Sequence, residues 1–63
     1  MDKWIKCSER MPTYKDGEVL IYNKAYDKIS IAVRTNENRW KGKYAIPKQI
    51  THWMPRPERP KED

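Results

Sequence analysis

The chain contains the stretch Thr51-His52-Trp53-Met54-Pro55-Arg56-Pro57, which holds its only histidine, one of three tryptophans and two of five prolines. Residues 49–53 read as a short strand, with Ile50 and His52 on one face and Thr51 and Trp53 on the other. Proline lacks a backbone N–H and fixes its own φ angle, so the prolines that follow end the strand. We therefore expect a final strand that pins Trp53 into a small core, followed by an extended tail.

Two segments in the middle of the chain carry clear strand patterns. Residues 18–22 are apolar on both alternating faces, which is typical of a central strand. Residues 28–34 alternate strictly and place Ile29, Ile31 and Val33 on one side. No window of the chain shows a convincing helical period, so we expect strands throughout.

A third strand is expected to begin at residues 39–41, after a turn at residues 35–38 whose side chains tolerate left-handed backbone. This strand should pair antiparallel with residues 28–34. Gly42 then marks its end or a bulge.

The fold class that follows is mainly β, a small antiparallel meander of three or four strands in a single domain spanning residues 1–63. Residues 1–17 form an irregular N-terminal arm, in which Ser8 begins a capped turn closed by Pro12. Residues 18–54 form the sheet. Residues 55–63 form an extended, proline-rich tail that frays after Glu58. We expect the arm and the last strand to close over one face.

Aromatic packing or self-association must stabilise a chain of 63 residues, because so short a domain buries little surface. Cys7 is the only cysteine, which rules out an internal disulfide, and one cysteine with one histidine cannot form a four-ligand zinc site. We expect Trp4 and Trp53 in the core and Trp40 to be the most exposed tryptophan.

The charge balance suits an anionic partner, since 14 lysines and arginines face 9 aspartates and glutamates, for a net charge of +5. The cations are spread along the chain, so an excess that serves only solubility explains the balance equally well. No segment reaches the length of a membrane span and no signal-peptide core follows Met1. We expect a cytoplasmic protein with no membrane contact, and the lone Cys7 suits a reducing compartment.

The two ends of the chain carry motifs in a recognisable order. They are Trp4-Ile5, Ser8-Glu9-Arg10-Met11-Pro12, Gly17-Glu18-Val19-Leu20, Trp40, and Thr51-His52-Trp53-Met54-Pro55 with Pro57. In this order they resemble a small domain family of unknown function found mainly in tailed bacteriophages, prophages and their hosts. Met11 and Arg56 stand where that family usually has leucine. The resemblance implies a shared fold and a phage origin, and it implies no activity.

His52 is the first candidate for chemistry, because histidine is the commonest general acid or base. Catalysis would require a nucleophile or an orienting partner such as Cys7, Ser8 or Glu9, and no motif supports such a pair. We expect a structural role instead, with the ring bonded to backbone or to Glu9. We therefore expect no enzyme, no catalytic residue, no cofactor and no metal.

Two groups of residues are candidates for binding. The first is a basic cluster in which cations flank an aromatic ring, formed by Arg34, Arg39, Trp40 and Lys41. The second is an alternative ligand site formed by Arg10, His52 and Trp53, in which the guanidinium would clamp an anion.

The leading hypothesis is a non-enzymatic phage accessory protein that binds and modulates or inhibits a host protein with an acidic surface, such as a defence protein. One alternative is a homo-oligomeric sponge for an anionic nucleotide, held by the second group of residues. Another is a small nucleic-acid-binding module. The weakest is a hydrolase that uses His52 and Cys7.

Overall fold

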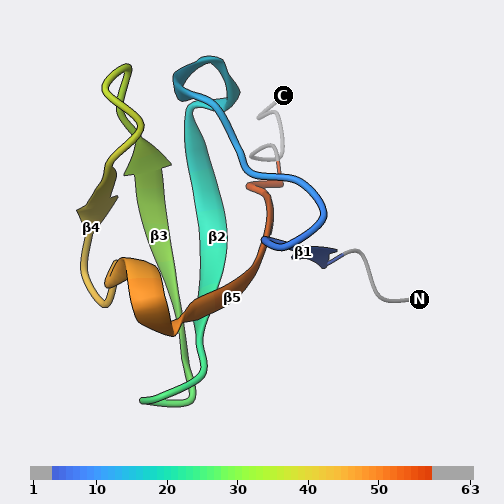
Figure 1. The fold of residues 1–63 in the computed structure, drawn as a ribbon, viewed down its shortest axis with the longest axis vertical. Coiled ribbons are helices and arrows are strands. Elements are labelled where there is room, and N and C mark those ends of the chain that lie inside the picture. The colour runs from blue at the N-terminus through green and yellow to red at the C-terminus, as the bar shows by residue number, and fades with distance from the viewer. Residues whose placement is uncertain (1–3, 58–63) are drawn as a thin grey trace, which may run out of the picture.

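The computed structural model describes residues 4–57, which form one five-stranded antiparallel sheet (Figure 1). Two 3₁₀ turns, η1 (Tyr14–Asp16) and η2 (Pro47–Gln49), connect its strands. In chain order the strands are β1 (Ile5–Lys6), β2 (Glu18–Asn23), β3 (Lys28–Arg34), β4 (Trp40–Gly42) and β5 (Ile50–Pro55). The predicted mainly β, antiparallel fold class is confirmed.

The order of the strands differs from a simple meander. β2, β3 and β4 form the predicted meander, but β5 returns to pair with the other side of β2, which gives the order β1-β5-β2-β3-β4. The predicted arm is not wholly irregular, because β1 pairs with β5 at the sheet edge. A strand of two residues is too short to show an alternating pattern, so the sequence predicted one strand too few. Pro55 belongs to β5, and the expected fraying after Glu58 lies outside the described residues.

The core lies on one face of the sheet. Val19 and Ile21 of β2 are fully buried there, and the register places Ala32 of β3 beside Val19 and Trp53 of β5 beside Ile21. The indole Nε1 of Trp53 donates a hydrogen bond to the carbonyl of Arg10 at 2.8 Å, which holds the arm over this face. Trp53 is therefore a core residue, as predicted.

A bulge in β5 changes which residues share the core face. Tyr22 pairs with His52, but the next residue of β2, Asn23, pairs with Ile50, so Thr51 is left without a partner in β2. The extra residue brings Ile50 to the same face as Trp53, where both are buried. The prediction that Ile50 and His52 share a face is therefore wrong.

Asn23 is the one fully buried polar side chain among the described residues, and it joins two connections, the β2–β3 hairpin and the segment between β4 and β5. Its Nδ2 donates to the carbonyl of Tyr44 and to Oε1 of Gln49, each at 3.0 Å. Its Oδ1 accepts from the backbone N–H of Tyr26 at 3.0 Å. The amide thus satisfies its hydrogen bonds while it fastens residues 44–49 over the end of the core.

The strict alternation predicted for β3 is present, but its apolar side faces outward. Ala32 is buried, whereas Ile29 is 61% exposed and Ile31 is 41% exposed. The arm covers the opposite side, where η1 contacts β3. The register groups eight side chains of β2, β3 and β5 on the uncovered side, which we call the open face: Glu18, Leu20, Tyr22, Ile29, Ile31, Val33, His52 and Met54.

Two short features of the connections also follow from local chemistry. The side-chain cap of the arm belongs to Thr13, whose hydroxyl accepts from the N–H of Lys15, while Asp16 accepts from the N–H of Thr13. Gly42 ends β4, one of the two outcomes expected. Its φ is 149°, and a Cβ there would lie 2.8 Å from the carbonyl oxygen of Ile31.

We expect Asn23→Ala to lower the free energy of unfolding by at least about 2 kcal/mol, because it removes a fully buried amide together with its hydrogen bonds to Tyr26, Tyr44 and Gln49. A domain this small has little stability to lose. Urea unfolding followed by circular dichroism measures the change. The matched control is Asn36→Ala in an exposed turn, which should change stability by no more than about 0.5 kcal/mol. Equal effects of the two variants would contradict the role of Asn23.

Candidate binding site

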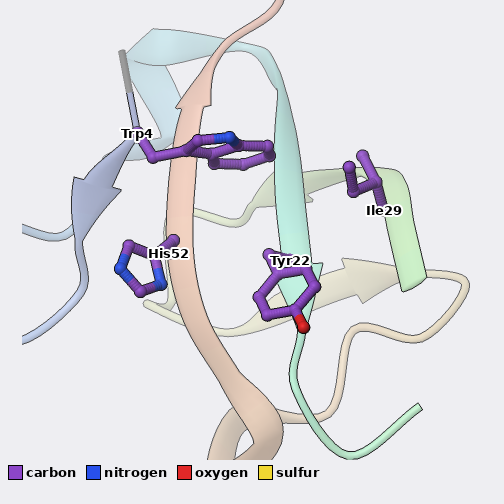
Figure 2. A pocket seen from close by; sticks show the side chains of 4 residues that line it. All are labelled: Trp4, Tyr22, Ile29 and His52. Atoms are coloured by element: carbon purple, nitrogen blue, oxygen red, sulfur yellow. The ribbon is translucent and has the colours of Figure 1, made fainter. Parts of the chain in front are cut away.

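The open face carries a pocket at one end of the sheet, lined by Trp4, Tyr22, Ile29 and His52, with a volume of ≈ 300 Å³. Tyr22 pairs with Ile29 on one side and with His52 on the other, so one row across three strands forms the floor. Trp4 directly precedes β1. Figure 2 shows its indole reaching across β5 above the imidazole and the phenol.

The bulge in β5 sets the position of His52. Its Nδ1 forms a hydrogen bond of 2.8 Å with the hydroxyl of Thr51, the residue that bulges. The ring meets that of Tyr22 edge-on, with centroids 6.5 Å apart and planes at 63°. The hydrogen bond of His52 is thus made to the side chain of its neighbour Thr51 rather than to backbone or to Glu9 as predicted, and Nε2 remains outside that bond.

Tyr22 closes the pocket on the hairpin side. Its hydroxyl donates to Oδ1 of Asp27 at 2.8 Å. This hydrogen bond raises the pKa of Tyr22 above its ordinary value of 10.0, and desolvation and the negative charge of Asp27 act in the same direction. The hydroxyl is therefore a fixed, protonated group at neutral pH.

The walls of the pocket suit an apolar group. Three rings and one branched aliphatic side chain line it, and aromatic walls of this kind accept a ring edge-on or in offset stacking. In the part of the chain that the structure describes, no group of three or more histidine, cysteine or acidic side chains could hold a metal ion. The lining therefore has the chemistry to accept an apolar side chain or ring.

A second hollow, of ≈ 320 Å³, adjoins the pocket at the β1 edge and shares His52 with it. Lys6, Cys7 and Thr51 are among its lining residues. Burial raises the pKa of the Cys7 thiol above its ordinary value of 9.0, and the positive charge of Arg34 offsets only part of this. A protonated thiol is a poor nucleophile, so the geometry lends no support to a reaction at Cys7.

The predicted basic cluster is divided between the two faces of the sheet. Arg34 pairs with Trp40 across β3 and β4, and its guanidinium lies 5.2 Å from the indole centroid. Trp40 also packs against the core, so it is not a freely exposed platform. Lys41 pairs with Val33, which places it at the open face. Arg39 lies exposed in the connection before β4.

The alternative ligand site is only partly assembled. The guanidinium of Arg10 lies 5.4 Å from the Trp53 ring centroid, on the core side of the sheet. Trp53 is fully buried and has no surface for a ligand. His52 belongs to the open face and does not join these two residues.

Three of the four residues around the pocket were missing from the predicted sites. Trp4 was expected in the core, but it is only half-buried and lines the open face. Tyr22 and Ile29 flank the hairpin turn at equal distances, and this symmetry is the signal that could have placed them opposite each other.

The fold and the pocket define a small antiparallel sheet domain with an apolar hollow on its uncovered face. The chain belongs to the family described as a protein of unknown function (DUF551), whose model matches residues 3–61. The resemblance drawn from the terminal motifs is confirmed to this extent, as an uncharacterised domain family. No curated protein and no solved structure matches the chain. Within residues 4–57, no helix has the length and apolarity needed to cross a membrane.

We expect Tyr22→Phe to destabilise the fold at neutral pH and to lose this effect in alkali. The folded-state pKa of Tyr22 is raised, so its hydrogen bond stabilises the fold fully below pH 10.0. That stabilisation is lost as the pH rises through the raised pKa. Urea unfolding of wild type and Tyr22→Phe, from neutral pH to above the raised pKa, measures the gap between their free energies of unfolding. In an Asp27→Asn background the gap at neutral pH should shrink; an unchanged gap would contradict the contact.

We expect Cys7 to react with iodoacetamide at pH 8 several-fold more slowly in the native protein than in concentrated urea, because burial raises its pKa. Arg34→Gln should slow the native reaction further, since it removes the charge that lowers this pKa. Arg39→Gln is the matched control and should leave the rate unchanged. A native rate equal to the rate in urea would show that the thiol is not held protonated.

Proposed function

We propose that this protein is a non-enzymatic binding domain that docks on another protein through the open face of its sheet. The observation that carries the proposal is the exposure of Ile29 and Ile31, at 61% and 41%. Ile29 lines the aromatic pocket, and Ile31 lies on the same face in the next row of side chains. Single exposed apolar residues are common, but a contiguous apolar patch with a pocket is typical of an interaction surface.

Charge supports an acidic partner. Lys6 stands opposite His52 at one edge of the open face, and Lys41 stands opposite Val33 at the other. Glu18, which the register also places on this side, forms a salt bridge with Arg56. The cations at both edges therefore attract a surface that carries carboxylates around an apolar centre.

A phage accessory role fits this surface. The motifs at the two ends of the chain resemble phage and prophage proteins, and a domain this small leaves little room for a separate catalytic site. We therefore place the partner among host proteins of the bacterial cytoplasm, including defence proteins, whose activity the bound domain modulates or inhibits.

The rival binding functions have less support. A nucleic-acid platform built on Arg34, Trp40 and Lys41 lacks a common surface, because Arg34 and Trp40 lie on the side of the sheet opposite Lys41. A nucleotide sponge built on Arg10, His52 and Trp53 lacks a common surface for the three side chains.

The test compares Ile31→Asp with Ile46→Asp. The two isoleucines are equally exposed, at 41% and 40%, but Ile46 belongs to the connection that precedes η2, outside the open face. Tagged proteins are used to capture partners from host lysate at low salt, and the affinity for the purified partner is then measured. We expect wild type and Ile46→Asp to bind alike.

We expect Ile31→Asp to weaken binding at least about tenfold, because a buried isoleucine contributes roughly 1.5–3 kcal/mol. Thermal unfolding verifies that both variants are folded. Equal binding by the two variants, or no stoichiometric partner for the wild type, would overturn the proposal.

A further inference from the structure

The pocket lies at the end of the open face, where it is best placed to fix the position of a docked partner. Tyr22, Ile29 and His52 form its row, and the next row along the strands consists of Leu20, Ile31 and Met54. One row is hollowed and the next is a continuous apolar surface. Interfaces concentrate their binding energy where a side chain fills such a pocket beside a flatter apolar area.

The chemistry of the walls selects the side chain that enters. Trp4, Tyr22 and His52 present ring faces and edges, and Ile29 supplies a branched aliphatic wall (Figure 2). The phenol hydroxyl is occupied by Asp27, so a second strongly polar group gains little from Tyr22. An aromatic or branched apolar side chain fits this lining best.

The charges around the pocket favour one sign of charge on the partner residues next to the inserted side chain. Lys6 is the cross-strand neighbour of His52 and lines the adjoining hollow. Lys24 is exposed in the hairpin beyond Tyr22, whereas Lys28 pairs with Asn23 and so belongs to the core side of the sheet. Asp27 is the only carboxylate between them in sequence, and it already accepts a hydrogen bond. The surroundings of the pocket therefore favour carboxylates and repel cations.

A second copy of this chain fits the pocket less well. A two-fold interface brings the same patch of each subunit together, so the Lys6 side chains of both copies would converge. With a net charge of +5 on each chain, such contacts add repulsion. Charge complementarity thus points to a different, acidic protein.

We propose that the pocket of Trp4, Tyr22, Ile29 and His52 is the anchor of the docking surface. It receives an aromatic or branched apolar side chain from an acidic segment of the partner protein, and carboxylates of that segment pair with Lys6. This inference rests on the proposed function, because it names the partner chemistry of the same face.

Two small probes test the pocket directly. Indole-3-acetate carries an indole ring with a carboxylate, and tryptamine carries the same ring with an ammonium group. Both are titrated into the full chain, followed by two-dimensional NMR. We expect indole-3-acetate to shift the resonances of Trp4, Tyr22, Ile29 and His52, and to bind at least about threefold more tightly than tryptamine.

Charge reversal then separates a binding role from a structural one. Lys6→Glu should reverse the preference in favour of tryptamine. Lys15→Glu, in η1 at the other end of β2, should leave the preference unchanged. Equal affinity for the two probes, shifts centred elsewhere, or a preference that Lys6→Glu does not alter would overturn the inference.

The captured partner distinguishes failure of this inference from failure of the proposed function. If Ile31→Asp abolishes binding while Lys6→Glu and Ile29→Thr do not change it, the face docks but the pocket is not its anchor. If none of the three changes binding, the docking function fails as well. A dimeric mass of the purified chain that Ile29→Thr converts to monomer would assign the pocket to a second copy and overturn the inference.

Discussion

The indole of Trp53 lies where three parts of the chain meet, with Ile5 of β1 on one side, Ile21 of β2 on the other and the carbonyl of Arg10 at its N–H. A buried N–H without a partner would cost the fold a large part of its small stability. The arm must therefore cross the face of the sheet on which Trp53 lies. Since the arm can cover only one face, this hydrogen bond also leaves the opposite face uncovered.

Asn23 holds a second segment of irregular chain over the core, as Trp53 holds the N-terminal arm. Its amide holds the segment that contains Tyr44 and Gln49 against the end of the core. The result is a single-layered sheet whose core is closed by irregular chain rather than by a second sheet or a helix. In so small a fold, the buried hydrogen bonds of Trp53 and Asn23 hold the covering segments in place, a role that larger buried apolar areas have in larger domains. The apolar residues Ile29 and Ile31 of β3 are left exposed on the open face.

The strands of the sheet could largely be predicted, because β3 alternates clearly and β2 is a short continuous apolar run, and both signals are local. The sequence could not predict which side of β3 is buried. Alternation with a period of two residues defines two faces, and only the position of the N-terminal arm decides which face is covered. The site prediction failed because it grouped residues that are close in sequence, whereas strand pairing decides which side chains share a face. Trp40 and Lys41 are adjacent in sequence and so point to opposite faces of β4, whereas Tyr22, Ile29 and His52 are distant and meet through pairing. His52 was chosen as a candidate because histidine titrates near neutral pH. Its position on the open face depends on a bulge in β5, which the periodicity of the sequence does not predict.

The position of β5 between β1 and β2 also bears on how the chain reaches its fold. Among residues 4–57, β1 pairs only with β5, and Trp53 is the one fully buried aromatic side chain of the core. During synthesis, at about 5–20 residues per second, the earlier strands can form only an open ribbon with both faces wet. The pairing that completes the sheet joins residues far apart in sequence, which makes it a slow, entropically costly closure. The sheet thus has its two distinct faces only once residues 50–55 lie between β1 and β2.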